Sequence, residues 1–443
     1  MKQNSYYLIS LGCAKNTVDS HSMSAILDLA GYEPAPDIDN AEVLIVNTCG
    51  FINPAREESI AVLKELSDLK QKNQILIAGG CLTQRFPEMI INKVPEVDGI
   101  FGTRRWMDIV EVLTNIKSQN SPTPYQHTAE IEHVGADEKG VIRTAIQGGS
   151  AYLKIADGCR RNCAFCAIPL IKGTTVSRPT KDILRDVEAL QNYGIKELIL
   201  IAQDTTDYGF DIGIKDGLSA LLAQILRFAP DIPWIRILYN YPGYVTDRLI
   251  ELMANNPQIL PYFDLPLQHA DPAILKRMNR PSDINWVYKT IEKLRAAIPD
   301  LAIRTTFIVG FPGETEKEFD SLLNFIKELR FDHVGVFPYS YEKGTPAERF
   351  GDPISEKIKL DRVRRLMSAQ ETISYEKNQL LIGKEMEILI EGSGDGISVG
   401  RTYRDAPEID GLVILDNEAP IGDFVRGKII GTMVHDLSAK ILK

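Results

Sequence analysis

Residues 158–166 read GCRRNCAFC and place Cys159, Cys163 and Cys166 in one short loop. The loop follows an apolar, strand-like segment at Tyr152–Ala156, and enzymes built as β/α barrels carry their chemistry in the loops after strands. Three thiolates this close together can hold three corners of a cubane iron–sulfur cluster, whereas an ordinary cluster takes four cysteines. Because no fourth cysteine lies nearby, one iron would keep an open position, which is where a cofactor or substrate binds.

Two plainer interpretations of this loop stay open: a zinc site, or three buried and inert thiols. Structural zinc takes four ligands, and no further Cys or His lies within 25 residues before Cys159 or after Cys166. Free cysteine is also often simply buried. The sequence favours a three-thiolate iron–sulfur site over both.

The region around the loop, residues 143–375, alternates strand-like and helix-like segments. Six strand-then-helix repeats predict a full or partial β/α barrel. The strand candidates are Tyr152–Ala156, Glu197–Ala202, Trp234–Tyr239, Tyr262–Pro266, Ala302–Val309 and His333–Pro338. A long charged helix is expected between Ser355 and Leu381.

Residues 1–120 show the same alternation in a shorter form. The apolar runs are Tyr6–Leu11, Val43–Val46 and Ile75–Ala78, and the helical patterns lie near Val18–Ala30 and Ala55–Leu69. Strands that alternate with helices usually pair in parallel. We therefore expect a first domain built on an open parallel α/β sheet.

Two further divisions follow from composition, which makes the chain an α/β protein of several domains. Residues 121–142 are polar and contain two prolines, a pattern typical of a linker. Residues 376–443 combine short apolar segments with many glycines, which predicts a small antiparallel β-barrel. Its strand candidates are Glu385–Ile390, Leu412–Leu415 and Phe424–Thr432.

The other three cysteines, Cys13, Cys49 and Cys81, each come shortly after an expected strand and just before an expected helix. In a parallel sheet such loops share the carboxyl edge, where ligands bind, so we expect the three thiols to meet. Helix amino termini also lower thiol pKa values, which favours the metal-binding thiolate. A second three-thiolate cluster is the preferred interpretation; packed small residues, or a redox trio forming disulfides, are the alternatives. Lys15 and Asn16 either lie near this cluster or simply begin a helix.

The composition excludes several classes of protein. The chain has 443 residues, of which 44% are hydrophobic and 25% charged, and a formal net charge of −10. These proportions exclude collagen-like, disordered and disulfide-knotted chains, and an acidic chain is not a general binder of nucleic acid. Neither a targeting signal nor an apolar run of membrane-spanning length is found. We therefore expect a cytoplasmic protein without a membrane partner, and cysteines in that compartment are more often metal-binding or catalytic than bridged.

Five segments resemble the methylthiotransferase family of radical S-adenosylmethionine enzymes. They are GCAKNTVDS at 12–20, NTCGFI at 47–52, GGC at 79–81, GCRRNCAFC at 158–166 and GRTYRDAPEIDG at 400–411. Phe165 matches the aromatic residue that the family carries before the last cysteine of its central motif, and all six cysteines fall on the family's ligand positions. The resemblance covers nearly the whole chain. It implies two [4Fe-4S] clusters, S-adenosylmethionine bound at the central one, and a carboxy-terminal TRAM domain.

Within the family, three segments resemble the branch that modifies ribosomal protein S twelve of the small subunit. They are CAIPLIKG at 166–173, LPLQH at 265–269 and YRDAPEIDG at 403–411. The transfer-RNA branch usually has Ser–Gly–Ser where this chain has His269–Ala270–Asp271. Residues 383–443 also carry seven Lys and Arg against eleven Asp and Glu, a net charge of −4. That charge suits a basic protein partner better than RNA, whose phosphates need cationic contacts, although it is also compatible with an ordinary solvated surface.

The resemblance implies transfer of a methylthio group to the β-carbon of an aspartate in that ribosomal protein. A 5′-deoxyadenosyl radical made at the central cluster removes the hydrogen, and the amino-terminal cluster carries the sulfur. We expect Gln203 and Arg304, on barrel strands, to contact the cofactor, and His269 to contact the substrate. The plainer interpretations are a structural ion pair for Arg304 and local packing for His269. No proton-transfer residue is assigned.

The same resemblance implies an electron donor, such as flavodoxin or ferredoxin, and a source of sulfur. Two rival functions share the cysteine motifs. The first is a transfer-RNA methylthiotransferase that modifies an adenosine next to the anticodon. The second is a non-catalytic iron–sulfur factor for ribosome assembly, which would leave S-adenosylmethionine intact.

Overall fold

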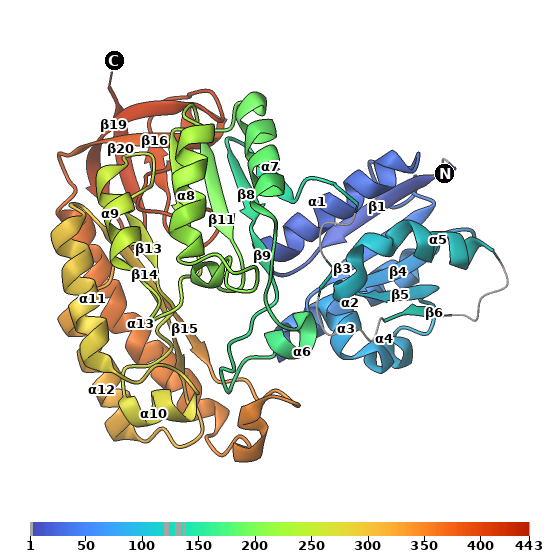
Figure 1. The fold of residues 1–443 in the computed structure, drawn as a ribbon, viewed down its shortest axis with the longest axis horizontal. Helices are drawn as coiled ribbons and strands as arrows, with labels where there is room; N and C mark the ends of the chain where they lie inside the picture. The colour runs from blue at the N-terminus through green and yellow to red at the C-terminus, as the bar shows by residue number, and fades with distance from the viewer. Residues whose placement is uncertain (1–2, 119–123, 129–133, 136–138, 443) are drawn as a thin grey trace.

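The computed structural model describes residues 3–118, 124–128, 134–135 and 139–442. Its amino-terminal part is a six-stranded parallel sheet in the order β2-β1-β3-β4-β5-β6 (Figure 1). The strands are β1 Ser5–Ser10, β2 Glu33–Pro34, β3 Val43–Thr48, β4 Ile75–Gly80, β5 Gly99–Gly102 and β6 Tyr125–His127. Strand β6 lies in the stretch expected to be a linker, where it instead pairs in parallel with β5 as an edge strand.

Helices cover both faces of this sheet because successive side chains of a strand point to opposite faces. Val43 and Ile45 of β3 pack against one pair of helices, α1 and α5. Leu44 and Val46 pack on the other face with α2 and α4. The helices are α1 Ala14–Leu29, α2 Asn53–Leu69, α3 Cys81–Arg85, α4 Pro87–Lys93 and α5 Ile109–Lys117. The open parallel α/β sheet is thereby confirmed.

The central region is a partial β/α barrel. Parallel strands β8, β11 and β12 form one sheet, with β7 antiparallel at its edge, and β13, β14 and β15 form another. A parallel bridge between Ile235 and Ile259 joins the two sheets. The strands are β7 Thr144–Gln147, β8 Ser150–Lys154, β11 Glu197–Ile201, β12 Trp234–Ile237, β13 Tyr262–Asp264, β14 Ala302–Val309 and β15 His333–Pro338. In the described part of the chain no strand pairing joins β7 to β15, so the barrel stays open on that side.

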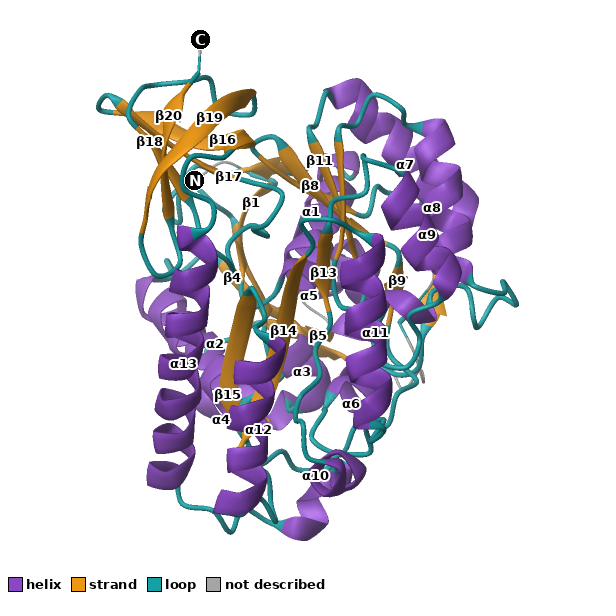
Figure 2. Cartoon of the chain, turned by 90° about the vertical axis from the view of Figure 1, so that its left-hand side faces the viewer, coloured by secondary structure: helices purple, strands orange, loops and turns teal. Residues whose placement is uncertain are grey.

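Helices surround the strands of the barrel on the outside (Figure 2). They are α7 Thr180–Tyr193, α8 Gly217–Phe228, α9 Asp247–Asn255, α11 Ile284–Ala297, α12 Glu316–Leu329 and α13 Glu356–Gln379. Helix α13 is the charged helix expected between Ser355 and Leu381. Across the described ranges, no helix has both the length and the apolar character needed to cross a membrane.

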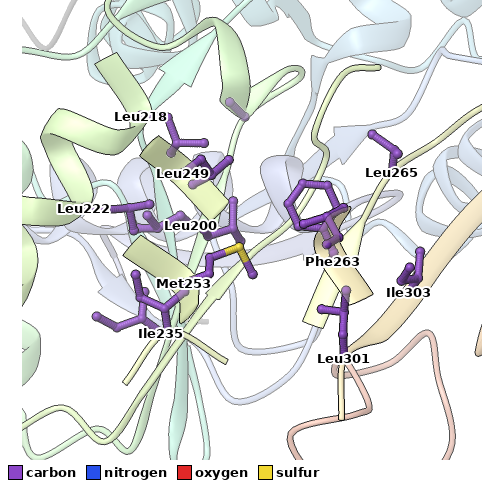
Figure 3. Close-up of a cluster of buried hydrophobic side chains, with 14 of the residues drawn as sticks. Leu200, Leu218, Leu222, Ile235, Leu249, Met253, Phe263, Leu265, Leu301 and Ile303 are labelled. Atoms are coloured by element: carbon purple, nitrogen blue, oxygen red, sulfur yellow. The ribbon is translucent and has the colours of Figure 1, made fainter. Parts of the chain in front are cut away.

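The apolar core of the barrel lies between the strands and these helices. Figure 3 shows Leu200 of β11 packed near Leu222 of α8 and Met253 of α9. The alternate residues Ile199 and Ile201 point to the other side of the strand, into the interior of the barrel. This alternation places one row of each strand against helices and leaves the other row to line the interior.

The carboxy-terminal part is a closed five-stranded barrel in the order β16-β17-β18-β20-β19. Its strands are β16 Glu385–Gly394, β17 Ile397–Arg401, β18 Val413–Leu415, β19 Phe424–Thr432 and β20 Leu437–Ile441. Four of the five pairings are antiparallel, as expected, and β18 pairs with β20 in parallel. The sequence analysis missed β17 and β20, which are short and carry small or polar residues between their apolar ones.

The end of β17 and the loop that follows it dock this small barrel onto the amino-terminal ends of the central strands. Arg401 reaches Glu197 of β11 (2.6 Å), and Arg404 reaches Asp332, just before β15 (2.9 Å). Ala406 packs into the interior cluster that also contains Ile199 and Ile201. Since Glu197 begins β11 and Asp332 directly precedes β15, these contacts cover the amino-terminal ends of strands from both sheets.

Replacing Glu197 by alanine is expected to destabilise the protein by about 3–5 kcal/mol, because removing one partner of a buried pair leaves charge uncompensated. The Glu197 carboxylate lies between the guanidinium groups of Arg236 (2.7 Å) and Arg401 (2.6 Å), and all three side chains are fully buried. Urea unfolding of wild type and variant measures the difference. Glu391 is the matched control, since it binds the same Arg401 from a side chain that is 30% exposed; Glu391→Ala should cost about 0–1 kcal/mol. Equal effects of the two variants would contradict the prediction.

Glu197 also makes the free energy of unfolding depend on pH. Burial alone would raise the pKa of Glu197, but Arg401 and Arg236 lower it from its usual 4.5 to about 2. The stabilising contribution is therefore complete above pH 4.5 and is lost as the pH falls toward 2. The free-energy difference between wild type and Glu197→Ala should shrink over this interval.

Candidate active site

The central cysteines lie in a loop after the short strand β9 (Ala156–Asp157). The backbone N–H of Cys159 donates to Gly173 O (3.0 Å), and that of Cys166 donates to Cys163 O (3.1 Å). The Cys163 Sγ lies 3.8 Å from the Tyr241 hydroxyl oxygen and 3.7 Å from Arg280 Nη1. The loop is thus folded back on itself, with its middle thiol facing an aromatic and a cationic side chain.

Burial and mutual electrostatic repulsion raise the pKa values of Cys159 and Cys166. Burial is the main reason that the pKa of Cys159 is raised to about 12, and Cys163 contributes to the rise. The pKa of Cys166 is also raised by burial and by Cys163 and Cys159. Without metal the protein holds these two thiols protonated, and metal binding has to displace the protons.

Two arginines flank this cluster of thiols. The Arg280 guanidinium lies over the Tyr241 ring, 4.2 Å from its centroid. Arg161, inside the cysteine loop, lies 4.6 Å from the same centroid and pairs with Asp204 at 2.8 Å. Its backbone N–H donates to the Cys159 sulfur at 3.4 Å. These groups place positive charge and a hydrogen-bond donor beside sulfur ligands that become anionic when they bind metal.

The amino-terminal cysteines occupy equivalent positions at the carboxyl edge of the first sheet. Cys13 caps α1, Cys49 directly follows β3, and Cys81 is the first residue of α3 directly after β4. The Asn16 side chain donates to Leu11 O (2.8 Å) and to the backbone oxygens that end β3. Its amide therefore ties the first cysteine loop to the second.

Close backbone packing brings the three loops together. A Cβ on Gly12, whose φ is +92°, would lie only 2.8 Å from the Cβ and 2.9 Å from the Sγ of Cys49. A Cβ on Gly50 would lie 2.9 Å from the carbonyl carbon of Cys81. Glycine is needed at both positions because the neighbouring loop occupies the space of a side chain.

One expectation about these thiols is wrong. Helix amino termini were expected to lower their pKa values, but burial raises the pKa of Cys49 and raises that of Cys81 to about 12. Desolvation of the thiolate outweighs the partial charge of a helix end. Lys172 opposes the effect at Cys81, whereas Cys49 and Cys13 reinforce it, which again indicates that the three thiols are close.

A buried ionic network connects the two cysteine sets. Asp19 of α1 accepts hydrogen bonds from Lys172 (2.8 Å) and Lys154. Both lysines also reach Asp157, at 3.4 Å and 3.1 Å, and Asp157 precedes Cys159 by two residues. Burial alone would raise the pKa of Asp157, but the ammonium groups of Lys154 and Lys172 lower it. The carboxylates therefore stay ionised and hold the first sheet against the barrel.

The segment after β12 makes a second connection. Tyr241 lies beside Cys163, as described, and Tyr239 lies under Lys15, whose Nζ is 3.1 Å from the ring centroid. Burial lowers the pKa of the Lys15 ammonium, while Cys13 and Asp264 oppose that effect. One short segment of the barrel thus faces both cysteine sets.

The structure places the three remaining candidates as follows. Gln203 follows β11, and its buried Oε1 has no hydrogen-bond partner among the described residues. Arg304 pairs with Asp264 (3.1 Å) and Asp410 (3.3 Å), in line with the plainer interpretation of a structural ion pair. His269 is fully buried, and its Nδ1 accepts from the Asp271 N–H (2.9 Å). Cofactor or substrate contact at these residues stays a prediction.

Sequence reasoning missed several residues of the site. Arg280 and Tyr241 reach it from segments that carry none of the quoted motifs, and Lys172, although it lies in the segment CAIPLIKG, was not singled out. Arg161 lies inside the cysteine motif and was the one that spacing alone could have indicated.

The donor sets fit iron–sulfur clusters. Each set offers three adjacent thiols, and none of the six cysteines, all of which are described, forms a disulfide. Among the described residues, no three His, Cys, Asp or Glu side chains form a site for a single metal ion. A cubane holds its cysteine sulfurs farther apart than one ion does, and the cationic neighbours suit its anionic ligand set.

Family models match three parts of the chain. The radical SAM superfamily matches residues 153–326, a model described as uncharacterized protein family UPF0004 matches residues 5–102, and the TRAM domain matches residues 382–442. Membership of the radical SAM superfamily implies S-adenosylmethionine and a [4Fe-4S] cluster as cofactors.

Comparisons with whole proteins agree with these matches. The chain is 43% identical to ribosomal protein uS12 methylthiotransferase RimO of Chloroflexus aurantiacus, over 99% of each chain. It is 45% identical to the protein of that name from Thermoanaerobacter sp. (strain X514), over 97% of this chain and 98% of the relative. Among solved structures, the chain is similar in fold to the radical S-adenosylmethionine methyltransferase TsrM from Kitasatospora setae, solved with cobalamin and a [4Fe-4S] cluster bound. The TM-score is 0.57 at 13% sequence identity, over 78% of this chain and 77% of that one. That last likeness is one of fold. The chain belongs to the RimO family of methylthiotransferases, within the radical S-adenosylmethionine superfamily.

Proposed function

We propose that this protein transfers a methylthio group to the β-carbon of an aspartate in ribosomal protein uS12. The relatives named above carry uS12 in their names. The observation that carries the proposal is the junction of two cysteine trios through the buried Asp19–Lys172–Asp157 contacts. A chemistry that needs a radical source and a sulfur source needs two such sites side by side.

We assign the central cluster to Cys159, Cys163 and Cys166 and a second [4Fe-4S] cluster to the other three cysteines. When bound, S-adenosylmethionine and these clusters supply the adenosyl radical and the sulfur, and the protein supplies orientation and exclusion of water. In this proposal residues 1–120 hold the sulfur site, residues 143–375 the radical site, and residues 376–443 meet the partner.

The chain's own residues have definite tasks in this proposal. Arg280 and Tyr241 orient the loop of the central thiols, and Asn16 holds the first two amino-terminal loops together. Lys172 and Asp19 fix the distance between the two sites, since they are buried and paired across the junction. Gln203 remains the candidate contact for the cofactor, because its buried oxygen has no partner among the described residues.

Charge supports a protein substrate. The carboxy-terminal barrel carries a net charge of −4 over residues 383–443, and ribosomal proteins are generally basic. Complementary charge speeds encounter and excludes wrong partners. We propose flavodoxin or ferredoxin as the electron donor, and a separate cellular source for the sulfur.

The test is a reaction with purified, anaerobically reconstituted protein, S-adenosylmethionine, a reductant and sulfide, offered either uS12 or bulk transfer RNA. Mass spectrometry should find one added methylthio group on uS12, located on an aspartate by fragmentation, and none on RNA. A methylthio adenosine in the RNA would favour the transfer-RNA rival. Intact S-adenosylmethionine together with tight binding to uS12 would favour the assembly-factor rival.

A further inference from the structure

Lys15 has no counter-ion among the described residues and lies over Tyr239, in the same short segment as Tyr241, which contacts Cys163. It follows Cys13 by two residues, and its Nζ lies over the ring of Tyr239. In the ranges that the structure describes, no hydrogen-bond acceptor or carboxylate is paired with this ammonium. The Lys15 side chain keeps part of its surface accessible, and Cys13 is exposed, so a ligand can reach both.

Among the described residues, the fully buried lysines all form ion pairs. Lys154 and Lys172 each bind Asp19 and Asp157, and Lys359 binds Asp352 at 2.6 Å. Removing an ammonium from water costs free energy unless an anion compensates it. Lys15 is only partly buried and has no such ion pair among the described residues, so its ammonium can accept an anion that comes from outside the chain.

The backbone holds Tyr239 in a strained conformation that fixes this arrangement. Its φ is +64°, a region that bulky residues rarely occupy. The Tyr239 N–H donates to Asp264 Oδ2 (2.8 Å), and its carbonyl accepts from the Thr205 N–H (3.1 Å). Such strain persists where the surroundings impose it and is common at functional sites. The ring is thereby kept against Lys15 while Tyr241 is kept against Cys163.

We propose that the Lys15 ammonium binds the side-chain carboxylate of the target aspartate, an inference that rests on the proposed function. The carboxylate carbon is bonded to the β-carbon that reacts. A cation two residues after Cys13, packed on the segment that also contacts Cys163, therefore places that carbon near both sites. The amino terminus of α1, where Lys15 lies in the first turn, adds favourable partial charge for an anion. An asparagine at the target position would leave the ammonium uncompensated and would bind poorly.

The experiment compares two peptides that span the target loop of uS12, one with aspartate and one with asparagine at the target position. Binding to the reconstituted holoenzyme is followed by fluorescence anisotropy with S-adenosylmethionine present and no reductant, so that no turnover occurs. Wild type should prefer the aspartate peptide by at least about tenfold, the size expected for one charge-assisted contact. Lys15→Met and Lys15→Gln should bind both peptides equally weakly, and Lys15→Arg should restore most of the preference.

Lys72→Met is the matched control, because Lys72 is an exposed lysine of the same domain; it should behave as wild type. Iron content and affinity for S-adenosylmethionine should be unchanged in the Lys15 variants. If the variants lose iron, Lys15 serves the cluster, and if they lose affinity for S-adenosylmethionine, it binds the cofactor's carboxylate; either result overturns the proposal, as does an unchanged preference for aspartate. Wild type that binds neither peptide would instead contradict the proposed function itself.

Discussion

Replacing Cys163 by alanine is expected to abolish the formation of 5′-deoxyadenosine from S-adenosylmethionine. Cys163 is the middle thiol of the central set and is the neighbour that raises the pKa of both Cys159 and Cys166. Without it only two thiols remain in the loop, and two ligands do not hold a cluster that ordinarily takes four. Iron in the reconstituted protein should fall from about eight to about four atoms per chain, since each [4Fe-4S] cluster contributes four. Chromatography after chemical reduction measures the nucleoside.

Tyr241→Phe is the matched control for this variant. It removes the hydroxyl that lies 3.8 Å from the Cys163 sulfur but leaves all three thiols, so cleavage of S-adenosylmethionine should survive. Continued cleavage by Cys163→Ala would show that the radical is not made at this loop. Loss of cleavage in both variants would mean that the loop's shape, rather than the thiol, is the sensitive feature.

The positions of the cysteines were predictable because the relevant signals are local. Cys13, Cys49 and Cys81 each follow an apolar run and precede a helical pattern, and parallel pairing places such loops at one edge. The strands Ala302–Val309 and His333–Pro338 were also expected with the bounds that the structure shows. The position of short periodic segments of this kind can be predicted from their own residues.

Contacts between distant segments were not predictable. Asp19 and Lys172 are 153 residues apart in sequence and meet through burial of both. The predicted lowering of the thiol pKa values was wrong for the same reason. The expected helix-end effect is local, whereas the desolvation that dominates at Cys81 depends on the packing of the whole junction. Strand β6 was hidden because Tyr125–His127 is a short polar segment that gains its structure from pairing with β5.

The segment at 400–411, which helped to identify the family, has a structural role inside this protein. Its residues contributed to the resemblance, but Arg401, Arg404 and Asp410 are engaged inside the protein. Asp410 accepts a hydrogen bond from the Tyr262 hydroxyl (2.6 Å) and pairs with Arg304. The segment therefore anchors the small barrel to the central one, and in the proposed function contact with a partner falls to other surfaces of the carboxy-terminal barrel.

Cys49→Ala should separate the two halves of the reaction: 5′-deoxyadenosine should still form at a rate near that of wild type, while no methylthio product appears on uS12. Cys49 lies in a loop of the first sheet and packs on Gly12, whereas the central thiols lie in the barrel. Losing one of three amino-terminal thiols removes the second cluster and leaves the first set complete, so about four irons per chain should remain. Parallel assays of the nucleoside and of uS12 mass check both halves.

Ser59→Ala distinguishes loss of the thiol from loss of the loop. The Ser59 hydroxyl accepts from the Cys49 N–H (3.0 Å) and donates to the Cys49 carbonyl (3.0 Å), so its removal loosens the loop and keeps the sulfur. Some transfer should persist in Ser59→Ala and none in Cys49→Ala. Transfer retained by Cys49→Ala would exclude these thiols as the sulfur site, whereas loss of nucleoside formation would show that the buried Asp19–Lys172–Asp157 contacts make each cluster depend on the other.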